Sequence, residues 1–243
     1  MRRMPSEASL ELRRELALAN RILYDQQVVD GLGHVSVRHP EDPAYFLLSA
    51  NRAPGLVRAS DVVCYDLDGK SVRPDAPRPY LERFIHSEIY RARPDVMAVV
   101  HSHSPNVIPF ACTGVALRPI FHMAGFLGQG SAHFEIRESA GDTDMLVSSP
   151  YLGQALARSL GGKTAVLMRG HGSTVVGTSL RQAVYRAIYA EVNARLQLAA
   201  QGLGPVTFLS EEEARLSSEM NDGQLGRSWD LWVRRLGQTD VDA

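Results

Sequence analysis

The strongest structural signal in the chain is the stretch Val96-Met97-Ala98-Val99-Val100-His101-Ser102-His103. A continuous apolar, β-branched run of this kind is typical of a strand buried on both faces of a sheet. Residues 82–93 before it read as a helix, which should end ahead of Pro94 because the residue before a proline disfavours helical dihedrals. Thr164–Arg169 is a second buried strand, and Ser173–Val176 follows it directly. We therefore expect these segments at the centre of a sheet.

Shorter elements flank these strands. The expected strands are Val35–Arg38, Phe46–Leu48 and Val62–Asp66, and the expected helices cover residues 7–30, a segment starting at Ser104-Pro105, residues 180–201 and a C-terminal region from Ser210. Apolar residues at helical spacing support the first helix. It should end at Gly31 and Gly33, because glycine is the usual residue just past a helix.

The order of these elements indicates the architecture. Capping-box pairs, Ser179 with Gln182 and Ser210 with Glu213, mark the start of the last two helices. Helices alternate irregularly with hairpin-like pairs of strands, which predicts an α/β fold of three layers, α/β/α, around a mixed sheet. No repeat and no linker longer than a turn interrupts the chain. We expect a single domain over residues 1–243.

Composition narrows the classes of partner. The 243 residues include 26 Lys and Arg against 27 Asp and Glu, for a net charge of −1. This balance argues against a nucleic-acid partner, which usually requires a basic excess. Apolar runs of about five residues are far shorter than the ~20 needed to cross a bilayer, so no membrane partner is expected. Two cysteines, Cys64 and Cys112, and the lack of a hydrophobic signal in Met1–Glu7 favour the cytoplasm.

Three histidines are spaced as a metal site requires. His101 and His103 are two residues apart on a strand, so both rings project from the same face. His171 lies between Gly170 and Gly172 at the end of the other buried strand. Three imidazoles with an open fourth position are typical of a catalytic divalent site. The alternative is that these histidines are merely polar residues at strand ends.

Glu82 is the next candidate. It opens a helix after Pro77-Arg78-Pro79, where a carboxylate gains from the helix dipole. It could therefore act in catalysis or simply stabilise its helix. His86 follows one turn later, and either supports Glu82 or packs in the interior.

Four segments together resemble the class II aldolase/adducin family. They are Gly33-His34-Val35-Ser36-Val37-Arg38, Glu82-Arg83-Phe84-Ile85-His86, Val99-Val100-His101-Ser102-His103 and Arg169-Gly170-His171-Gly172, and their order and separations also match. The resemblance spans roughly residues 10–200. It implies a three-layer fold with a largely antiparallel central sheet and a homotetramer with sites between subunits. It further implies a divalent metal, Zn, Mn, Co or Fe, held by His101, His103 and His171, with Glu82 as an acid/base that can also reach the metal.

The chain departs from the sugar-phosphate members of that family. His34 stands where those enzymes have an Asn, the segment Ser49-Ala50-Asn51-Arg52-Ala53-Pro54 replaces a Ser-Gly loop, and Tyr80-Leu81 replaces a Ser-Ser pair. A phosphate dianion needs several small donors around it, so a sugar phosphate fits poorly. Arg52 could instead bind a carboxylate bidentately, and His34 could donate a hydrogen bond or a proton.

The amino-acid sequence of residues 80–107 and 170–197 resembles the decarboxylase branch of the family, whose members act in aromatic-compound degradation. The resemblance therefore implies a carbon–carbon lyase, a divalent-metal-dependent decarboxylase of a hydroxy-substituted aromatic or dienoic carboxylic acid. Glu82 or His34 would protonate the carbon that loses carbon dioxide. Contacts to this small-molecule substrate are expected from Ser49, Arg52, Tyr80 and His122.

Three alternatives stay open. The first is a class II aldolase, an aldehyde-lyase, that acts on a non-phosphorylated substrate through the same metal and Glu82. The second is an iron-dependent oxygenase. The third is a non-catalytic adducin-like interaction module, although such modules lose metal ligands that this chain retains.

Overall fold

The computed structural model describes residues 8–237 and 241, and a seven-stranded sheet lies at its centre. The strands are β1 (His34–Arg38), β2 (Tyr45–Ser49), β3 (Val62–Asp66), β4 (Ala98–Ser102), β5 (Ala132–Phe134), β6 (Ala165–Met168) and β7 (Gly172–Gly177). They are ordered β3-β2-β1-β4-β7-β6-β5. The predicted strands therefore exist, each with ends within about two residues of its expected bounds.

The sheet is mixed and largely antiparallel, as expected. Neighbouring strands run antiparallel except β5 and β6, which pair in parallel. The central strand β4 pairs with β1 on one side and β7 on the other, and all five of its residues are buried. A strand in this position is shielded on both faces, which explains its uninterrupted apolar sequence.

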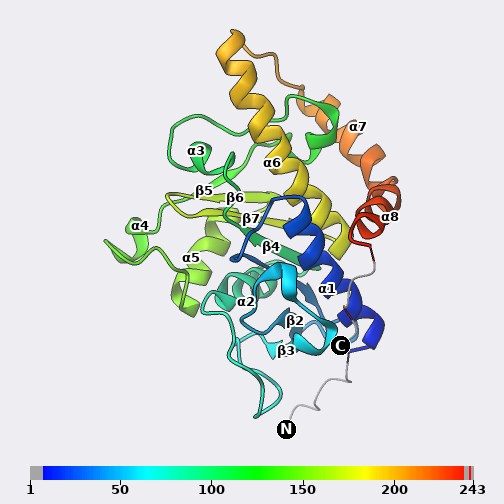
Figure 1. Ribbon diagram of the computed structural model, residues 1–243. Helices are drawn as coiled ribbons and strands as arrows, with labels where there is room; N and C mark the ends of the chain where they lie inside the picture. Colours follow the sequence, from blue (N-terminus) through cyan, green and yellow to red (C-terminus); the bar gives the residue numbers. More distant parts are fainter. Residues whose placement is uncertain (1–7, 238–240, 242–243) are drawn as a thin grey trace.

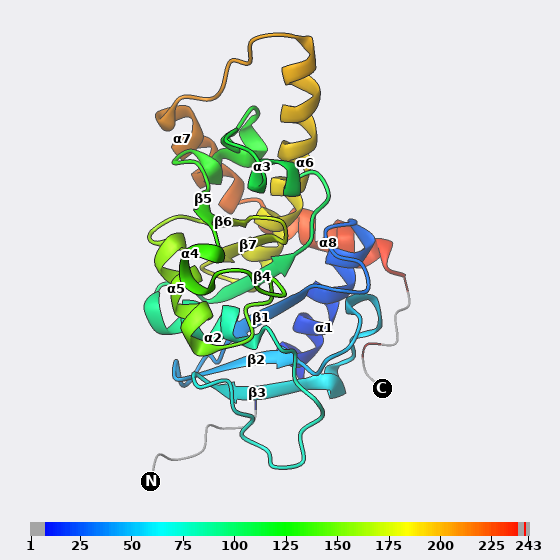
Figure 2. The same cartoon turned by 90° about the vertical axis from the view of Figure 1, so that its left-hand side faces the viewer.

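Helices cover both faces of the sheet, which confirms the three-layer α/β fold (Figures 1 and 2). The helices are α1 (Leu10–Asp25), α2 (Arg83–Ala92), α3 (Ile108–Ala111), α4 (Arg137–Ala140), α5 (Pro150–Leu160), α6 (Leu180–Leu203), α7 (Glu211–Asp222) and α8 (Leu225–Arg235), with 3-10 turns η1 (Pro54–Leu56), η2 (Ala59–Asp61) and η3 (His122–Leu127). Figure 2 shows α1 and α8 on one side of the strands and α2 and α5 on the other.

Two hydrophobic clusters separate these layers. Val100 of β4 packs into the cluster under α1 and α6, whereas Val99 packs into the cluster under α2 and α5. This alternation follows from the period of two along a strand. Each face of β4 thus anchors a different helical layer.

The first helix ends earlier than predicted. It stops at Asp25 with Gln26 as its C-cap, and Gln27 adopts a left-handed conformation with φ 59°. The expectation that Gly31 and Gly33 terminate this helix was therefore wrong. Gly33 instead has φ 100°, and a Cβ there would lie 2.6 Å from Val29 and 3.1 Å from the His101 carbonyl oxygen. Its role is to let the chain enter β1 close to β4.

The helix expected to start at Ser104-Pro105 is shorter than predicted. The Ser104 hydroxyl donates to the Val28 carbonyl rather than capping a helix, and the α-helical part is confined to Ile108–Ala111. The Ser210–Glu213 capping box is complete. At Ser179 only half of the box forms, because the Gln182 side chain accepts from the N–H of Thr178 instead.

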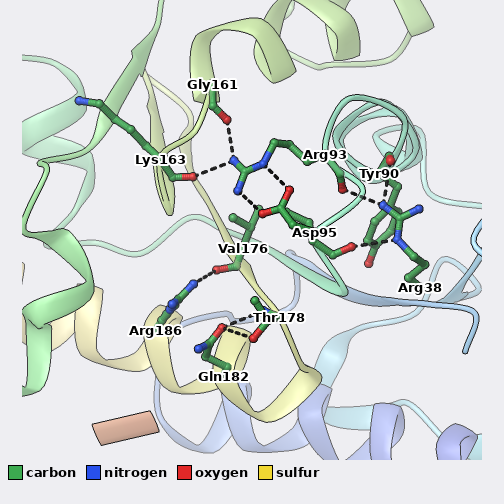
Figure 3. A network of polar contacts seen from close by, with 11 residues as sticks. Arg38, Tyr90, Arg93, Asp95, Gly161, Lys163, Val176, Thr178, Gln182 and Arg186 are labelled. Carbon is green, nitrogen blue, oxygen red and sulfur yellow. Dashed lines mark hydrogen bonds and ion pairs between the residues drawn. The ribbon is translucent and has the colours of Figure 1, made fainter. Parts of the chain in front are cut away.

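A buried arginine ties β1 to the connection between α2 and β4 (Figure 3). Arg38 is 4% exposed, and its guanidinium donates to the carbonyls of Val96, Pro43, Tyr90 and Arg93 at 2.8–2.9 Å. Four acceptors compensate for much of the loss of solvation of the buried charge. This network braces the ends of the elements that carry the candidate site.

Within the described residues, no helix is both long and apolar enough to pass through a membrane. The segment Met1–Glu7, in which no export signal was found, lies outside the described residues.

Candidate metal centre and active site

Strand register brings the candidate site residues to one end of the central strands. His34 begins β1 directly opposite His101 near the end of β4. His103 comes just after β4, and β4 pairs with β7 so that Ser102 lies opposite Ser173. The β6–β7 turn therefore places His171 beside His103. Glu82, the N-cap residue of α2, faces this cluster.

The four residues Glu82, His101, His103 and His171 offer ligand atoms that all lie within 4.8 Å of one another. The Nε2 atom of His103 is 3.3 Å from that of His101 and 3.1 Å from that of His171. Oε2 of Glu82 is 3.6 Å from Nε2 of His101 and of His171. Tetrahedral ligands at about 2.0–2.1 Å from one ion are separated by roughly 3.3–3.4 Å. The donor set therefore fits a single divalent cation.

Three of these ligand residues also form a hydrogen bond through the nitrogen or oxygen atom that does not face the cluster. Nδ1 of His101 lies 3.3 Å from the Thr174 hydroxyl, and Nδ1 of His171 lies 2.9 Å from the Met145 carbonyl oxygen. Oε1 of Glu82 accepts from the Val147 N–H at 2.9 Å. Such partners hold a ring so that its other nitrogen points at the ion. The sequence did not reveal the roles of Met145 and Val147, because both act through backbone atoms.

Two unusual backbone positions support this arrangement. Met145 has φ 71°, a left-handed conformation that is strained for a non-glycine residue. A Cβ on Gly172 would lie 2.1 Å from the Ser102 carbonyl oxygen. Glycine is therefore required for β7 to approach β4 closely next to His103 and His171.

Burial and neighbouring charge set the protonation of the cluster. Burial lowers the pKa of His101 and of His103, so both rings are held in the neutral form that binds metals. Burial also disfavours the charged forms of His171 and Glu82, but the hydrogen bond and the attraction between these two side chains outweigh this effect of burial. The pKa of His171 is raised, and hydrogen bonding and charge from His171 and His101 lower the pKa of Glu82 to about 2. Glu82 is thus a carboxylate at neutral pH.

His34 lies against this cluster. Its ring centroid is 5.0 Å from that of His101 and 4.7 Å from that of Tyr80. Burial lowers its pKa well below the ordinary range. Its Nδ1 lies 2.6 Å from Nε2 of His86, which is fully buried. His86 therefore packs in the interior, one of the two options left open, and its hydrogen bonds go to His34 and Ser36 rather than to Glu82.

Tyr80 and Ser49 lie beside His34, but Arg52 is directed elsewhere. The Tyr80 hydroxyl contacts Ser49 Oγ at 3.3 Å and the backbone carbonyl of Arg52. The Arg52 guanidinium donates to the Leu56 carbonyl at 2.8 Å and pairs with Asp61 at 3.3 Å. Nε and one terminal nitrogen of Arg52 are thus engaged within its own loop, and the predicted contact of Arg52 with a substrate carboxylate stays a prediction.

His122 does not join the cluster within this chain. It lies exposed on η3, its ring contacts Phe121, and its carbonyl oxygen accepts from Asn221. Its predicted contact with substrate depended on a neighbouring subunit and stays a prediction.

A cavity opens beside His103. Its volume is about 590 Å³, and its lining includes Tyr24, Gln27, Val29, Asp30 and Pro105. Cavities of about 300–1,000 Å³ are typical of sites for small molecules. Through His103, the cluster thus borders a space large enough for a single-ring molecule.

Several known proteins are similar to this chain in sequence and in fold. A model of the class II aldolase and adducin N-terminal domain matches residues 14–198. Decarboxylase tropJ of Talaromyces stipitatus is 42% identical over 239 residues, 88% of this chain and 90% of that protein. The 3,4-dihydroxyphthalate decarboxylase of Arthrobacter keyseri is 33% identical over 207 residues, 79% of each chain. An aldolase II superfamily protein from Pseudomonas syringae superposes with a TM-score of 0.79 over 98% of this chain and 96% of its own, at 25% identity.

The family model spans most of the chain, and the decarboxylases align with it over more than three quarters of their lengths. The chain therefore belongs to the class II aldolase and adducin family, in its decarboxylase branch, and is a carbon–carbon lyase.

Proposed function

We propose that this protein is a divalent-metal-dependent decarboxylase of a hydroxy-substituted aromatic or dienoic carboxylic acid. The observation that carries the proposal is the convergence of Glu82, His101, His103 and His171 on one point beside a cavity of about 590 Å³. The likeness to the two decarboxylases supports the reaction class. The name of the Arthrobacter relative supports a substrate that carries a hydroxyl and a carboxylate on neighbouring carbons of one aromatic ring.

Three imidazoles with one carboxylate suit Zn, Mn, Co or Fe. His101, His103 and His171 would hold the cation through Nε2, with Glu82 close enough to contribute an oxygen. When bound, a divalent cation supplies a Lewis acid that stabilises negative charge on an oxygen conjugated to the breaking carbon–carbon bond.

The side chains of this protein would carry out the proton transfers. Glu82 is ionised at neutral pH because its pKa is lowered to about 2, so its carboxylate is in the form that can accept the proton of a substrate hydroxyl whose acidity a bound cation would raise. The carbon–carboxylate bond then breaks, carbon dioxide leaves, and its electron pair stays on the carbon. Glu82 returns the proton to that carbon, which completes the exchange of carbon dioxide for hydrogen. In this scheme the neutral His34 stabilises the charged oxygen by donating a hydrogen bond.

The remaining expected contacts are part of the same proposal. Tyr80 and Ser49 would line the substrate side of His34, since the Tyr80 ring packs against His34 and its hydroxyl contacts Ser49. Arg52 would bind a second carboxylate through the guanidinium donors that Leu56 and Asp61 do not engage. His122 would serve a neighbouring active site in a homotetramer, which light scattering of the purified protein can test.

The decisive experiment measures carbon dioxide release from 3,4-dihydroxyphthalate and related hydroxy-carboxylates, before and after removal of metal with a chelator. We expect release that stops on chelation and returns when Mn²⁺, Co²⁺, Zn²⁺ or Fe²⁺ is added back. Release of an aldehyde without carbon dioxide would favour the aldolase, and strict dependence on oxygen would favour the oxygenase. Full activity in metal-free protein would refute the proposal.

A further inference from the structure

Four buried side chains form a hydrogen-bonded row that starts at His34 and leads away from the cation-binding cluster. Nδ1 of His34 is 2.6 Å from Nε2 of His86, whose Nδ1 is 2.6 Å from the Ser36 hydroxyl, which is 2.7 Å from the Tyr90 hydroxyl. All four are at most 4% exposed. His34 is the member at the site, and its Nδ1 is occupied, so Nε2 is the ring nitrogen left for a substrate.

Both rings of the row lie in the interior. Burial lowers the pKa of His86 to about 3, and His34, which is 4% exposed, shares one hydrogen with the His86 ring. A neutral imidazole has one N–H and one acceptor nitrogen, and which nitrogen carries the hydrogen depends on its partners. The row therefore has two possible orders of its protons, and each one determines a different tautomer of His34.

In the first order, hydrogens point from Tyr90 toward the site. Tyr90 donates to Ser36, Ser36 donates to Nδ1 of His86, and Nε2–H of His86 donates to Nδ1 of His34. His34 then carries its hydrogen on Nε2 and presents a donor to the substrate. In the second order every bond is reversed, and His34 presents an acceptor.

The far end of the row favours the first order. Among the described residues, the Tyr90 hydroxyl contacts the Ser36 hydroxyl and the backbone of Val99, and the Val99 bond lowers the pKa of Tyr90, as expected of an N–H that donates to the phenol oxygen and cannot accept its hydrogen. In the second order Ser36 would donate to Tyr90, and the Tyr90 hydrogen would be left buried without an acceptor, which is unfavourable. In the first order every hydrogen of the row is used.

The Arg38 charge acts in the same direction. Its guanidinium carbon lies 4.7 Å from the centre of the Tyr90 ring. In the first order the donors point away from Tyr90, so the negative end of the row's dipole lies nearest this cation. The second order would place the positive end there. Because the site is buried, this electrostatic preference is weakly screened.

We propose that His86, Ser36 and Tyr90 are positioning residues that hold His34 in the Nε2–H tautomer, which makes it a neutral hydrogen-bond donor to the substrate. The role of His34 toward the substrate rests on the proposed function, whereas the assignment of its ring hydrogen to Nε2 does not. A neutral imidazole used in this way stabilises charge on an oxygen without giving up its proton. This assigns charge stabilisation to His34 and leaves proton transfer to Glu82.

Nitrogen-15 NMR of protein labelled at its eight histidines, in the zinc-loaded form near pH 8, tests the tautomer without substrate. Protonated and unprotonated ring nitrogens have well-separated shifts, and the His34→Gln variant identifies the His34 signals by their loss. We expect Nε2 of His34 to be protonated and Nδ1 to be an acceptor. Protonation of Nδ1 in the wild-type protein would overturn the proposal, whether or not the protein decarboxylates anything.

Two variants of similar size then test the direction of control. In His86→Gln the amide N–H₂ can donate to His34 and its oxygen can accept from Ser36, so the order is kept. In His86→Glu the carboxylate demands a hydrogen from Nδ1 of His34. We expect a proton on Nδ1 of His34 only in His86→Glu, together with a kcat about tenfold lower than that of His86→Gln at similar KM. Equal His34 shifts and equal kcat in the two folded variants would contradict the inference, and the wild-type spectrum decides it if either variant fails to fold.

Discussion

Nε2 of His103 lies 3.1 Å from Nε2 of His171, although 68 residues separate them along the chain. The contact is a direct product of sheet register. Ser102 pairs with Ser173 across β4 and β7, so the residues just beyond these strand ends meet. The same pairing builds the centre of the fold and assembles the candidate cation site. Changes that disturb this strand pair should therefore affect stability and metal binding together.

Removing one ring of the cluster should abolish metal binding. His103→Ala deletes the nitrogen that lies within 3.3 Å of both His101 and His171. We expect the metal content of the purified variant, measured by plasma mass spectrometry, to fall from about one ion per chain to near zero. Turnover should fall at least about 100-fold, because the chemistry depends on the Lewis acid.

His133→Ala is the matched control for that substitution. His133 is an exposed histidine on β5 that contacts the Phe110 carbonyl and is not part of the cluster. The His133→Ala variant should keep both its bound metal and its decarboxylase activity. A metal-replete His103→Ala variant would remove His103 from the ligand set.

A single methyl group should disturb the strand pair. In Gly172→Ala the new Cβ would lie 2.1 Å from the Ser102 carbonyl oxygen. This atom belongs to the backbone of β4 and cannot move aside without shifting the strand. We expect a loss of about 1–3 kcal/mol in the free energy of unfolding. Metal affinity should also fall, because His171 is the preceding residue.

Gly162→Ala provides the control, since a Cβ there would have no atom within 4 Å and the residue has no positive φ. Urea unfolding and metal titration of both variants give the comparison. If Gly172→Ala were as stable as Gly162→Ala, with unchanged metal affinity, the close approach of β4 and β7 would be needed neither for stability nor for metal binding.

Much of the fold could be predicted from local pattern. The central strands were predicted because a buried strand is a continuous apolar run, and His101 and His103 follow from a period of two along one of them. The short edge strand β5 (Ala132–Phe134) was not predicted. Helix ends were less predictable. Gly31 and Gly33 resemble a stop signal, yet α1 ends at Asp25 because Gln27 turns the chain with φ 59°.

The surroundings of the site could not be predicted in the same way. The Met145 carbonyl and the Val147 N–H hold His171 and Glu82 through the backbone, and backbone contacts leave no trace in residue identity. Arg52 illustrates the reverse case. Its side chain suits a carboxylate ligand, but the sequence did not show that Asp61 is one carboxylate with which it pairs.

Acid should destabilise the protein through its buried histidines. Burial lowers the pKa of His86 to about 3, whereas a histidine in the unfolded chain titrates near about 6.5. Between these values the unfolded state binds more protons, so stability falls as the pH falls. The contribution of His86 is fully present above about pH 6.5 and is lost toward pH 3, at up to about 1.4 kcal/mol per pH unit.

Urea unfolding between about pH 7.5 and 5, in the presence of a chelator so that metal release does not contribute, measures this effect. His86→Gln should be less stable than wild type at pH 7.5, because the hydrogen bonds with His34 and Ser36 are altered. Its stability should, however, decline less steeply with acid. Identical slopes for the two proteins would mean that His86 does not remain neutral in the folded state.

The role of Glu82 can be separated from that of the three histidines. Glu82→Gln keeps the size of the side chain and an oxygen that can accept from the Val147 N–H, but it can no longer carry a proton. We expect kcat to fall about 100- to 10,000-fold, the range usual for loss of a general acid–base group. The three histidines should still bind the cation, with affinity lowered by the loss of one negative charge.

Saturating Mn²⁺ distinguishes the two ways in which Glu82 could matter. If Glu82 only helped to hold the cation through Oε2, excess metal would restore turnover of Glu82→Gln to near the wild-type rate. If it carries the proton, the variant stays inactive although fully loaded, which is the result we expect. Glu88→Gln is the matched control, because Glu88 is a buried glutamate on the same helix that pairs with Arg91 and does not belong to the cluster. Its metal affinity and kcat should match those of the wild type, so that a defect confined to Glu82→Gln reports proton transfer at this one carboxylate.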